Sequence, residues 1–527
     1  MNASSQASAT TEDGTRAAGR GGIAVLAAKV FFLITGFVQQ PLLRRAVGLN
    51  DFGSLAQALA LANTVNNVVV STGTQGVSRV VAGSPGHERR ALGAVFRVHG
   101  VAAVVIAGAM AAAAPLYGRF ERANDVVAPL LVLALVALLY GVYAPLIGYL
   151  NGRRRFGRQA ALDIAFATLR TVGLVVLGRL FVTRGLSGAL GTTFGWVAAA
   201  MLIVPLAFRS IAEDRPDADA NQAPVISSRA YLTMLLPIAG AQLCTNLLLQ
   251  VDIFLLGRFL SDGAAAAGLA DEAQRAAVTP WMAVYKECQT FAFLPYQLLF
   301  SVTLVLFPML ARAHAMGDRE AVRAYVARGA RLAAILAGLL VAVIVAMPES
   351  MLAFAYGATD AARGAPVLRA MALAQGAFTM LGIATTVLTS TGRERTAALV
   401  TLAAVIAVAC ACTALVPGAS IGAAQLVRSA QATGIALVVT LLVAGAIVRT
   451  KTGAFVPLAT GVRVVLAVGA CLGLGFAMPR VGLLATPLVA AMVGVLYAGI
   501  LVITRELRAA DFAMIRALGA KRSVRVG

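Results

Sequence analysis

The sequence predicts an all-α polytopic membrane protein with about 14 transmembrane helices. Three observations predict this fold class: apolar runs fill nearly the whole chain, 59% of residues are hydrophobic and only 13% are charged, and the short loops alternate between high and low positive charge. A soluble protein contains about 25% charged residues, and a membrane-crossing helix needs about 20 mostly apolar residues. Such long, Ala- and Leu-rich runs do not fit the alternating pattern of a membrane β-barrel.

The predicted helices follow one another with short connections. Several exceed the length of a minimal span, so we expect their ends to project into water or the helices to tilt. Their expected ranges are 22–43, 52–80, 90–115, 126–149, 158–182, 186–210, 229–258, 283–312, 326–347, 363–390, 394–415, 419–448, 459–479 and 482–505.

The positive charge lies mostly on one side of the predicted membrane. Of 44 Lys and Arg residues, 29 belong to the termini and the loops that follow even-numbered helices, 10 lie on the opposite side, and five lie within spans. Loops rich in Lys and Arg are cytoplasmic, so we expect both termini in the cytoplasm. The net charge of +21 is therefore a topology signal, and we expect no nucleic-acid partner.

A polar segment at mid-chain divides the predicted helices into six and eight. Residues 1–20 lack an apolar stretch, which predicts a disordered tail and not a secretory signal. The predicted organisation is a cytoplasmic tail (1–20), a first helix bundle (21–210), a cytoplasmic linker (211–228), a second bundle (229–448), two further helices (449–506) and a basic cytoplasmic tail (507–527).

Four of the predicted helices carry polar side chains at helical spacing. A polar side chain in hydrocarbon is costly and normally faces protein or a watery cavity. Any one of these residues could simply hydrogen-bond a neighbouring helix, but four polar stripes together favour a shared cavity. The stripes are Lys29, Gly36 and Gln40; Gln57, Thr64, Asn67, Ser71, Thr74 and Ser78; Gln242, Asn246 and Gln250; and Lys286, Gln289, Thr290, Gln297 and Ser301.

Ionisable residues inside the spans sharpen this hypothesis. Arg170 and Arg428 lie nearer mid-span than other cations, and a cationic cavity suits an anionic substrate because Lys and Arg can replace the water around phosphate oxygens. Acidic Asp163, Asp252 and Glu287 could bind a coupling proton or cation, or neutralise a nearby Arg. The candidate substrate-binding residues are Lys29, Gln40, Asn67, Arg170, Asn246, Gln250, Lys286, Gln289 and Arg428.

Catalytic motifs are scarce. A G-x-S-x-G match covers residues 418–422, but we expect an external loop between two helices there, whereas a nucleophile elbow needs a strand-to-helix turn and a His. We expect all three His (His87, His99 and His314) in or beside cytoplasmic segments. The five Cys lie in apolar spans and are interpreted as small buried residues. We therefore predict no catalytic residue, no metal and no cofactor besides a coupling H+ or Na+.

Six stretches follow one another in a characteristic order over residues 22–505. They are Pro41 to Gly53, Leu236 to Ile253, Tyr285 to Arg312 with its Phe307-Pro308, Gly364 to Arg369, Leu388 to Arg393, and Gly422 to Ala424. No single motif is specific, but in this order they resemble the polysaccharide-flippase (Wzx-like) branch of the multidrug/oligosaccharidyl-lipid/polysaccharide (MOP) exporter superfamily.

This resemblance implies two six-helix bundles around a central cavity, lined by helices 1, 2, 7 and 8, plus two C-terminal helices. It also implies a flippase in the bacterial inner membrane that moves undecaprenyl-pyrophosphate-linked oligosaccharide to the external leaflet by alternating access. Lys29, Arg170, Lys286 and Arg428 would then contact pyrophosphate or acidic sugars. The expected partners are the lipid-linked glycan, the phospholipid bilayer, and the glycan polymerase or export machinery.

Three other functions stay open at this point. A drug or metabolite:cation antiporter would share the fold, and deeper acidic residues without a cationic cavity would favour it. Lipid II flippases carry more Arg in their first helices, whereas the first predicted helix here offers Lys29 alone. A membrane glycan polymerase or ligase would present catalytic charges in a large external segment, and residues 261–282 are instead Ala-rich with four charges.

Overall fold

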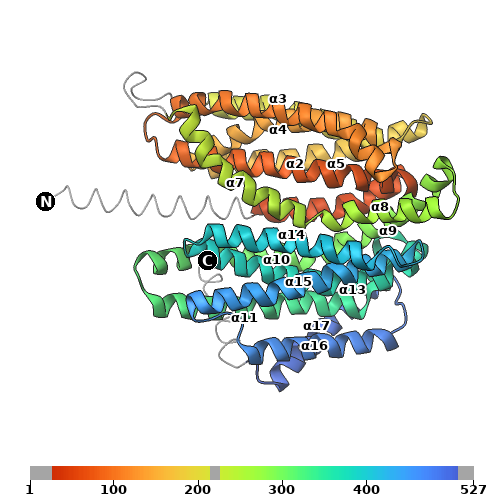
Figure 1. Ribbon diagram of the computed structural model, residues 1–527. Coiled ribbons are helices and arrows are strands. Elements are labelled where there is room, and N and C mark those ends of the chain that lie inside the picture. The colour runs from red at the N-terminus through yellow and green to blue at the C-terminus, as the bar shows by residue number, and fades with distance from the viewer. Residues whose placement is uncertain (1–26, 214–225, 508–527) are drawn as a thin grey trace, which may run out of the picture. The chain divides into compact units, whose positions relative to one another are not determined.

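The computed structural model describes residues 27–213 and 226–507, in which every regular element is helical (Figure 1). The side chains at 298–302, 304 and 305, including Ser301, lie outside this description. So do the predicted N-terminal tail, most of the 211–228 linker and nearly all of the 507–527 tail. Over the described ranges, the predicted all-α fold class is confirmed.

Eleven described helices are long and apolar enough to cross a membrane. The predicted spans 22–43, 52–80 and 283–312 are outside that set. The first begins before the described residues, and the third includes the side chains that are not described. The second corresponds to α2 (Leu49–Ala82), which is fully described. The polar stripe of α2 lowers its mean hydropathy, so α2 is outside the set of eleven. The total of fourteen membrane-spanning helices stays a prediction.

The chain forms two compact units, residues Met1–Ala283 and Val284–Gly527. Besides α2 and a helix over residues 27–47, the first unit contains α3 (Glu88–Glu121), η1 (Asn124–Val126), α4 (Val127–Gly152), α5 (Phe156–Thr183), α6 (Gly188–Ala212), α7 (Ser228–Leu248), α8 (Val251–Ala266) and the beginning of α9 (Asp271–Ala292). Helices α7 and α8 belong to this unit because both pack on α2 and α3. The predicted division into bundles at the 211–228 linker stays a prediction.

Helix α4 is the centre of the first unit. It packs against α2, α3 and α6, and large residues such as Leu130, Leu133 and Tyr149 are fully buried. Helices α5 and α6 approach each other at Gly173 and Gly195, where an added Cβ on Gly195 would lie 2.1 Å from the Gly173 carbonyl oxygen. Only glycine allows two helix backbones to come this close.

The second unit is organised around α13. Its elements after α9 are α10 (Leu294–Ala315), α11 (Arg319–Ala346), α12 (Pro348–Tyr356), α13 (Ala358–Ser390), α14 (Glu394–Leu415), α15 (Ala423–Thr452), α16 (Leu458–Ala477) and α17 (Thr486–Ile503). Helix α13 packs on α10, α11, α12, α14 and α15, while α16 and α17 pack on α11. Arg369 of α13 donates to the carbonyl oxygens of Val345 (3.2 Å) and Gly475 (2.6 Å), which ties α13 to α11 and α16.

Two predicted spans are not continuous helices. The 229–258 span is interrupted at residues 249–250 between α7 and α8, and the 283–312 span at Phe293 between α9 and α10. Most of the predicted external segment over residues 261–282 is helical and belongs to α8 and α9. Its alanines favour helix, and Asp271 and Glu272 lie in the first turn of α9, where the helix dipole stabilises acids.

Two of the five cysteines differ from expectation, and His99 is buried. Cys288, Cys412 and Cys471 are buried as predicted, but Cys244 is half-buried and Cys410 is exposed. His99 lies well inside α3 and is buried against α7, where its Nε2 is 2.7 Å from the Tyr231 hydroxyl. The position of His99 in or beside a cytoplasmic segment stays a prediction.

Candidate functional site

Two predicted site residues meet between the first helix (27–47) and α5. The Lys29 Nζ lies 3.7 Å from the Asp163 Oδ2; the Lys29 side chain is 60% exposed and the Asp163 side chain 16%. The half-buried carboxylate therefore has a cation beside it, which fits the alternative role of Asp163 in neutralising a neighbouring charge.

Arg170 also faces the first helix, seven residues further along α5. Its guanidinium lies 5.1 Å from the Phe32 ring centre and 5.3 Å from that of Trp196, and its Nη2 is 3.5 Å from the Gln39 Oε1. Its Nε is buried without a hydrogen-bond partner, and among described residues no carboxylate lies within 4.0 Å of it. A guanidinium stacked on aromatic rings without an acid partner keeps its charge available for an anion.

Gln39, which accepts a hydrogen bond from Arg170, was not among the predicted site residues. The Gln39 Oε1 also accepts a 3.0 Å hydrogen bond from the Thr171 hydroxyl, and the side chain is buried. The predicted residue was the adjacent Gln40, whose Oε1 is buried without a hydrogen-bond partner. The pair Gln39-Gln40 was the available signal, but one-dimensional spacing does not show which of two neighbours faces α5.

The polar stripes of α2 and α7 meet at Asn67 and Asn246. The Asn67 amide donates to the Asn246 Oδ1 at 2.9 Å, and the Asn246 amide donates to the Gln242 carbonyl oxygen at 2.8 Å. Gln250 precedes α8 and is buried, with its Oε1 unpaired. Asp252 is buried in the first turn of α8, where its Oδ1 accepts from the Ile253 amide.

In the second unit, the predicted residues of α9 form a local polar group. The Lys286 Nζ donates to the Gln289 Oε1 at 2.8 Å, and Gln289 and Glu287 are fully or almost fully buried. Arg428 is separate from this group. It is exposed and lies in the second turn of α15, so its expected position near mid-span is wrong. The span was placed too early because residues 416–422 form a loop and not the start of the helix.

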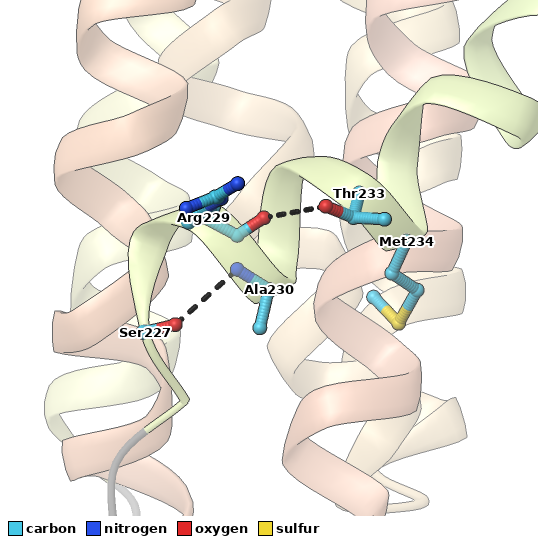
Figure 2. A pocket seen from close by; sticks show the side chains of 5 residues that line it. All are labelled: Ser227, Arg229, Ala230, Thr233 and Met234. Atoms are coloured by element: carbon cyan, nitrogen blue, oxygen red, sulfur yellow. Dashed lines mark hydrogen bonds between the residues drawn. The ribbon is translucent and has the colours of Figure 1, made fainter.

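The hollow shown in Figure 2 is not this site. It has a volume of about 550 Å³ and is lined by residues at the start of α7, Ser227, Arg229, Ala230, Thr233 and Met234. Its polar atoms begin the helix: the Ser227 hydroxyl accepts from the Ala230 amide, and the Thr233 hydroxyl donates to the Arg229 carbonyl oxygen. None of the predicted site residues lines it.

The G-x-S-x-G match at 418–422 lies in the loop between α14 and α15, not in a strand-to-helix turn. The expected loop between two helices is confirmed, and this context is not that of a nucleophile elbow. Among described residues, no group of three or more His, Cys, Asp and Glu side chains is placed to hold a metal ion.

The family model described as "Polysaccharide biosynthesis protein" matches residues 18–314, more than half of the chain. The chain belongs to this family. The match spans every helix from the first to α10, including the four polar stripes and all predicted site residues except Arg428. No curated protein matches the chain.

Solved structures show that this polysaccharide biosynthesis family member has the fold of MOP transporters. An inward closed conformation of the lipid II flippase MurJ aligns with a TM-score of 0.70 and 12% identity, over 92% of this chain and 99% of that one. An inward-facing multidrug resistance MATE transporter gives 0.62 and 13%, over 82% and 98%. A MOP transporter from Pyrococcus furiosus gives 0.57 and 14%, over 82% and 95%. At 12–14% identity these likenesses show the fold, and the family is shown by the match over residues 18–314.

Proposed function

We propose that this protein is a flippase that moves undecaprenyl-pyrophosphate-linked oligosaccharide from the cytoplasmic to the external leaflet of the bacterial inner membrane, by alternating access, for surface polysaccharide export. One observation carries the proposal: a polysaccharide biosynthesis family match over residues 18–314 on a MOP transporter fold. Both termini would be cytoplasmic, and the glycan polymerase or export machinery would receive the product.

The surroundings of Arg170 and Lys286 support an anionic substrate. Arg170 is held by aromatic rings and an amide, and Lys286 donates to an amide oxygen. Both guanidinium and ammonium groups can bind pyrophosphate oxygens. Asp163, Asp252 and Glu287 remain candidates for coupling to H+ or Na+.

The second candidate is a lipid II flippase, because MurJ aligns over 99% of its own length. Lipid II and lipid-linked oligosaccharide share a lipid pyrophosphate, so the two candidates differ in the glycan and not in the charge that the site must bind. An antiporter of the same fold and a membrane glycan polymerase or ligase are further outcomes of the test.

The test is deletion of the gene followed by leaflet-resolved analysis of lipid-linked glycans. We expect oligosaccharide units to accumulate in the cytoplasmic leaflet while lipid II stays normally distributed. Accumulation of lipid II instead would favour the second candidate. Unpolymerised units exposed on the external leaflet would indicate a polymerase, and unchanged glycans with altered drug efflux would indicate an antiporter.

Substitutions test the proposed anion contacts. We expect Arg170→Ala and Lys286→Ala each to lower glycan export about tenfold or more, because a charge-assisted hydrogen bond contributes about 1.5–3 kcal/mol. Arg209→Ala is the matched control: Arg209 is exposed and pairs with Glu213 four residues away, so export should be unchanged. Normal export by both test variants at normal abundance would remove these residues from the site.

A further inference from the structure

A second set of polar side chains gathers where α2, α3, η1, α8 and α9 meet in the first unit. By the predicted orientation this is the external end of these helices. Its centre is Glu121, the last residue of α3, whose side chain is fully buried. The Glu121 Oε2 accepts a 2.9 Å hydrogen bond from the Gln57 Nε2, and the Oε1 is buried without a hydrogen-bond partner.

Cations lie near Glu121 but are paired with other acids. Arg275 of α9 donates to the Gln57 Oε1 at 2.9 Å and forms an ion pair with Asp125 at 2.7 Å. Among described residues, no Lys or Arg nitrogen lies within 4.0 Å of the Glu121 carboxyl group. The nearby Tyr117 hydroxyl donates to the Gln57 carbonyl oxygen.

The cations on the α8 side are paired as well. Arg258 forms an ion pair with Asp262 at 2.8 Å and donates to the Phe120 carbonyl oxygen at 2.7 Å. Arg122 shares Asp262 at 3.2 Å. The side chains of Asp125 and Asp262 are 41% and 42% exposed, so they form a solvent-exposed rim beside the buried carboxyl group of Glu121.

Helix α8 packs tightly against Glu121, and α9 packs tightly against α2. A Cβ on Gly257 of α8 would lie 2.0 Å from the Glu121 Oε2, and a Cβ on Gly53 of α2 would lie 1.9 Å from the Thr279 carbonyl oxygen of α9. The Ser261 hydroxyl of α8 donates to the Glu121 carbonyl oxygen at 2.8 Å. Any outward movement of α8 and α9 would therefore expose Glu121 to water.

We propose that Glu121 is the proton-binding residue of a latch that holds α8 and α9 against α2 and α3, and that it is protonated when the latch is closed and ionised when it opens. Burial without a direct cation disfavours a carboxylate, whereas water stabilises it. The ligand is a proton and not a metal cation. One free carboxyl oxygen supplies too few ligands for a metal ion, and the nearby positive charges of Arg275 and Arg258 would repel it. The proposal rests on the alternating access proposed above.

The test measures latch opening without measuring transport. Ala264 is fully buried on α8 and Leu269 is exposed just after it. Each is replaced by Cys in a full-length chain whose five native cysteines are changed to alanine, and both proteins are reconstituted in lipid vesicles. Both proteins are labelled with a membrane-impermeant maleimide, and the labelling rate of Ala264→Cys is divided by that of Leu269→Cys. This ratio reports latch opening, because the exposed Leu269→Cys thiol corrects for the pH dependence of thiol reactivity.

We expect the ratio to rise with external pH, by up to about tenfold per pH unit, because opening releases one proton. Glu121→Gln should keep it low at every pH, and Gly257→Ala, whose Cβ meets the closed carboxyl group, should keep it high. Glu213→Gln, the same change at an exposed residue, should behave like the parent. The latch proposal is overturned if the ratio of the parent does not change with external pH, or if the ratio of Glu121→Gln rises with pH as steeply as that of the parent. Glycan transport is tested separately, by the deletion assay above. If that assay shows no glycan transport while the labelling follows the expected pattern, only the proposed function is overturned.

Discussion

Glu121 and Glu506 are both almost completely buried, with 0% and 3% of the residue exposed, but their surroundings are opposite. Glu121 in the first unit contacts an amide and has one unpaired oxygen. Glu506 in the second unit, just after α17, accepts from the Arg331 Nε at 2.7 Å and the Arg463 Nη1 at 2.9 Å. The Thr460 hydroxyl adds a third donor at 2.7 Å.

The comparison of the two sites shows that burial alone does not decide whether a carboxyl group is charged. Burial acts to raise the pKa of Glu506, but hydrogen bonds from Arg331, Arg463 and Thr460 and the charge of Arg331 outweigh it and hold this pKa below its usual value. Glu506 is therefore a fixed anion that joins α11 and α16 to the end of α17. Glu121 accepts from the Gln57 amide and, among described residues, meets no guanidinium donor, which leaves it free to exchange a proton.

The largest expected effect is that of Glu506→Gln. The substitution leaves Arg331 and Arg463 without their anion, and we expect a loss of about 2 kcal/mol in the free energy of unfolding, the scale of hydrogen bonds to a charged group. SDS titration of the purified full chain measures it. A loss below about 0.5 kcal/mol would show that the two guanidinium groups are adequately hydrated without Glu506, and the comparison would fail.

A smaller effect is expected from acid. Because the pKa of Glu506 is lower in the folded than in the unfolded chain, its contribution is complete above the unfolded value, about 4.3, and is lost as pH falls through the folded value. It amounts to about 1.4 kcal/mol for each pH unit between the two pKa values. The stability difference between the parent and Glu506→Gln should shrink over this acidic range, and a difference that grows there would contradict the assignment.

The smallest effect is expected from Glu121→Gln. If Glu121 is neutral in the closed latch, the neutral amide replaces a neutral acid, and the free energy of unfolding at neutral pH should change by less than about 0.5 kcal/mol. The same SDS titration applies. A loss as large as that of Glu506→Gln would mean that Glu121 is a second structural anion, which would erase the contrast between the sites.

The fold was largely predictable from the sequence because the membrane leaves few choices. A long apolar run can satisfy its backbone groups only as a helix, so helices such as α4, α11 and α13 follow from hydropathy. The breaks at residues 249–250 and Phe293 were missed because apolar composition continues through them. The end of α8 and the start of α9 lay outside the predicted spans because residues 261–282 combine small residues with four charged ones, which lowers their hydropathy.

The site was predictable to the level of helices and not of contacts. Spacing identified α2, α7 and α9 as polar, and Asn67 and Asn246 do meet. The partners of Arg170 and Glu121 lie 131 and 64 residues away in the chain. No local pattern relates residues so far apart, so neither Gln39 nor the Glu121 cluster was found.

The sequence by itself determined the membrane as solvent, the helical architecture and the helices that carry polar faces, because the cost of burying backbone and side-chain polar groups in lipid acts on each segment separately. Only the tertiary structure decided which charges are neutralised. Whether a buried carboxyl group meets two guanidinium groups, as Glu506 does, or a single amide, as Glu121 does, depends on the packing of distant helices.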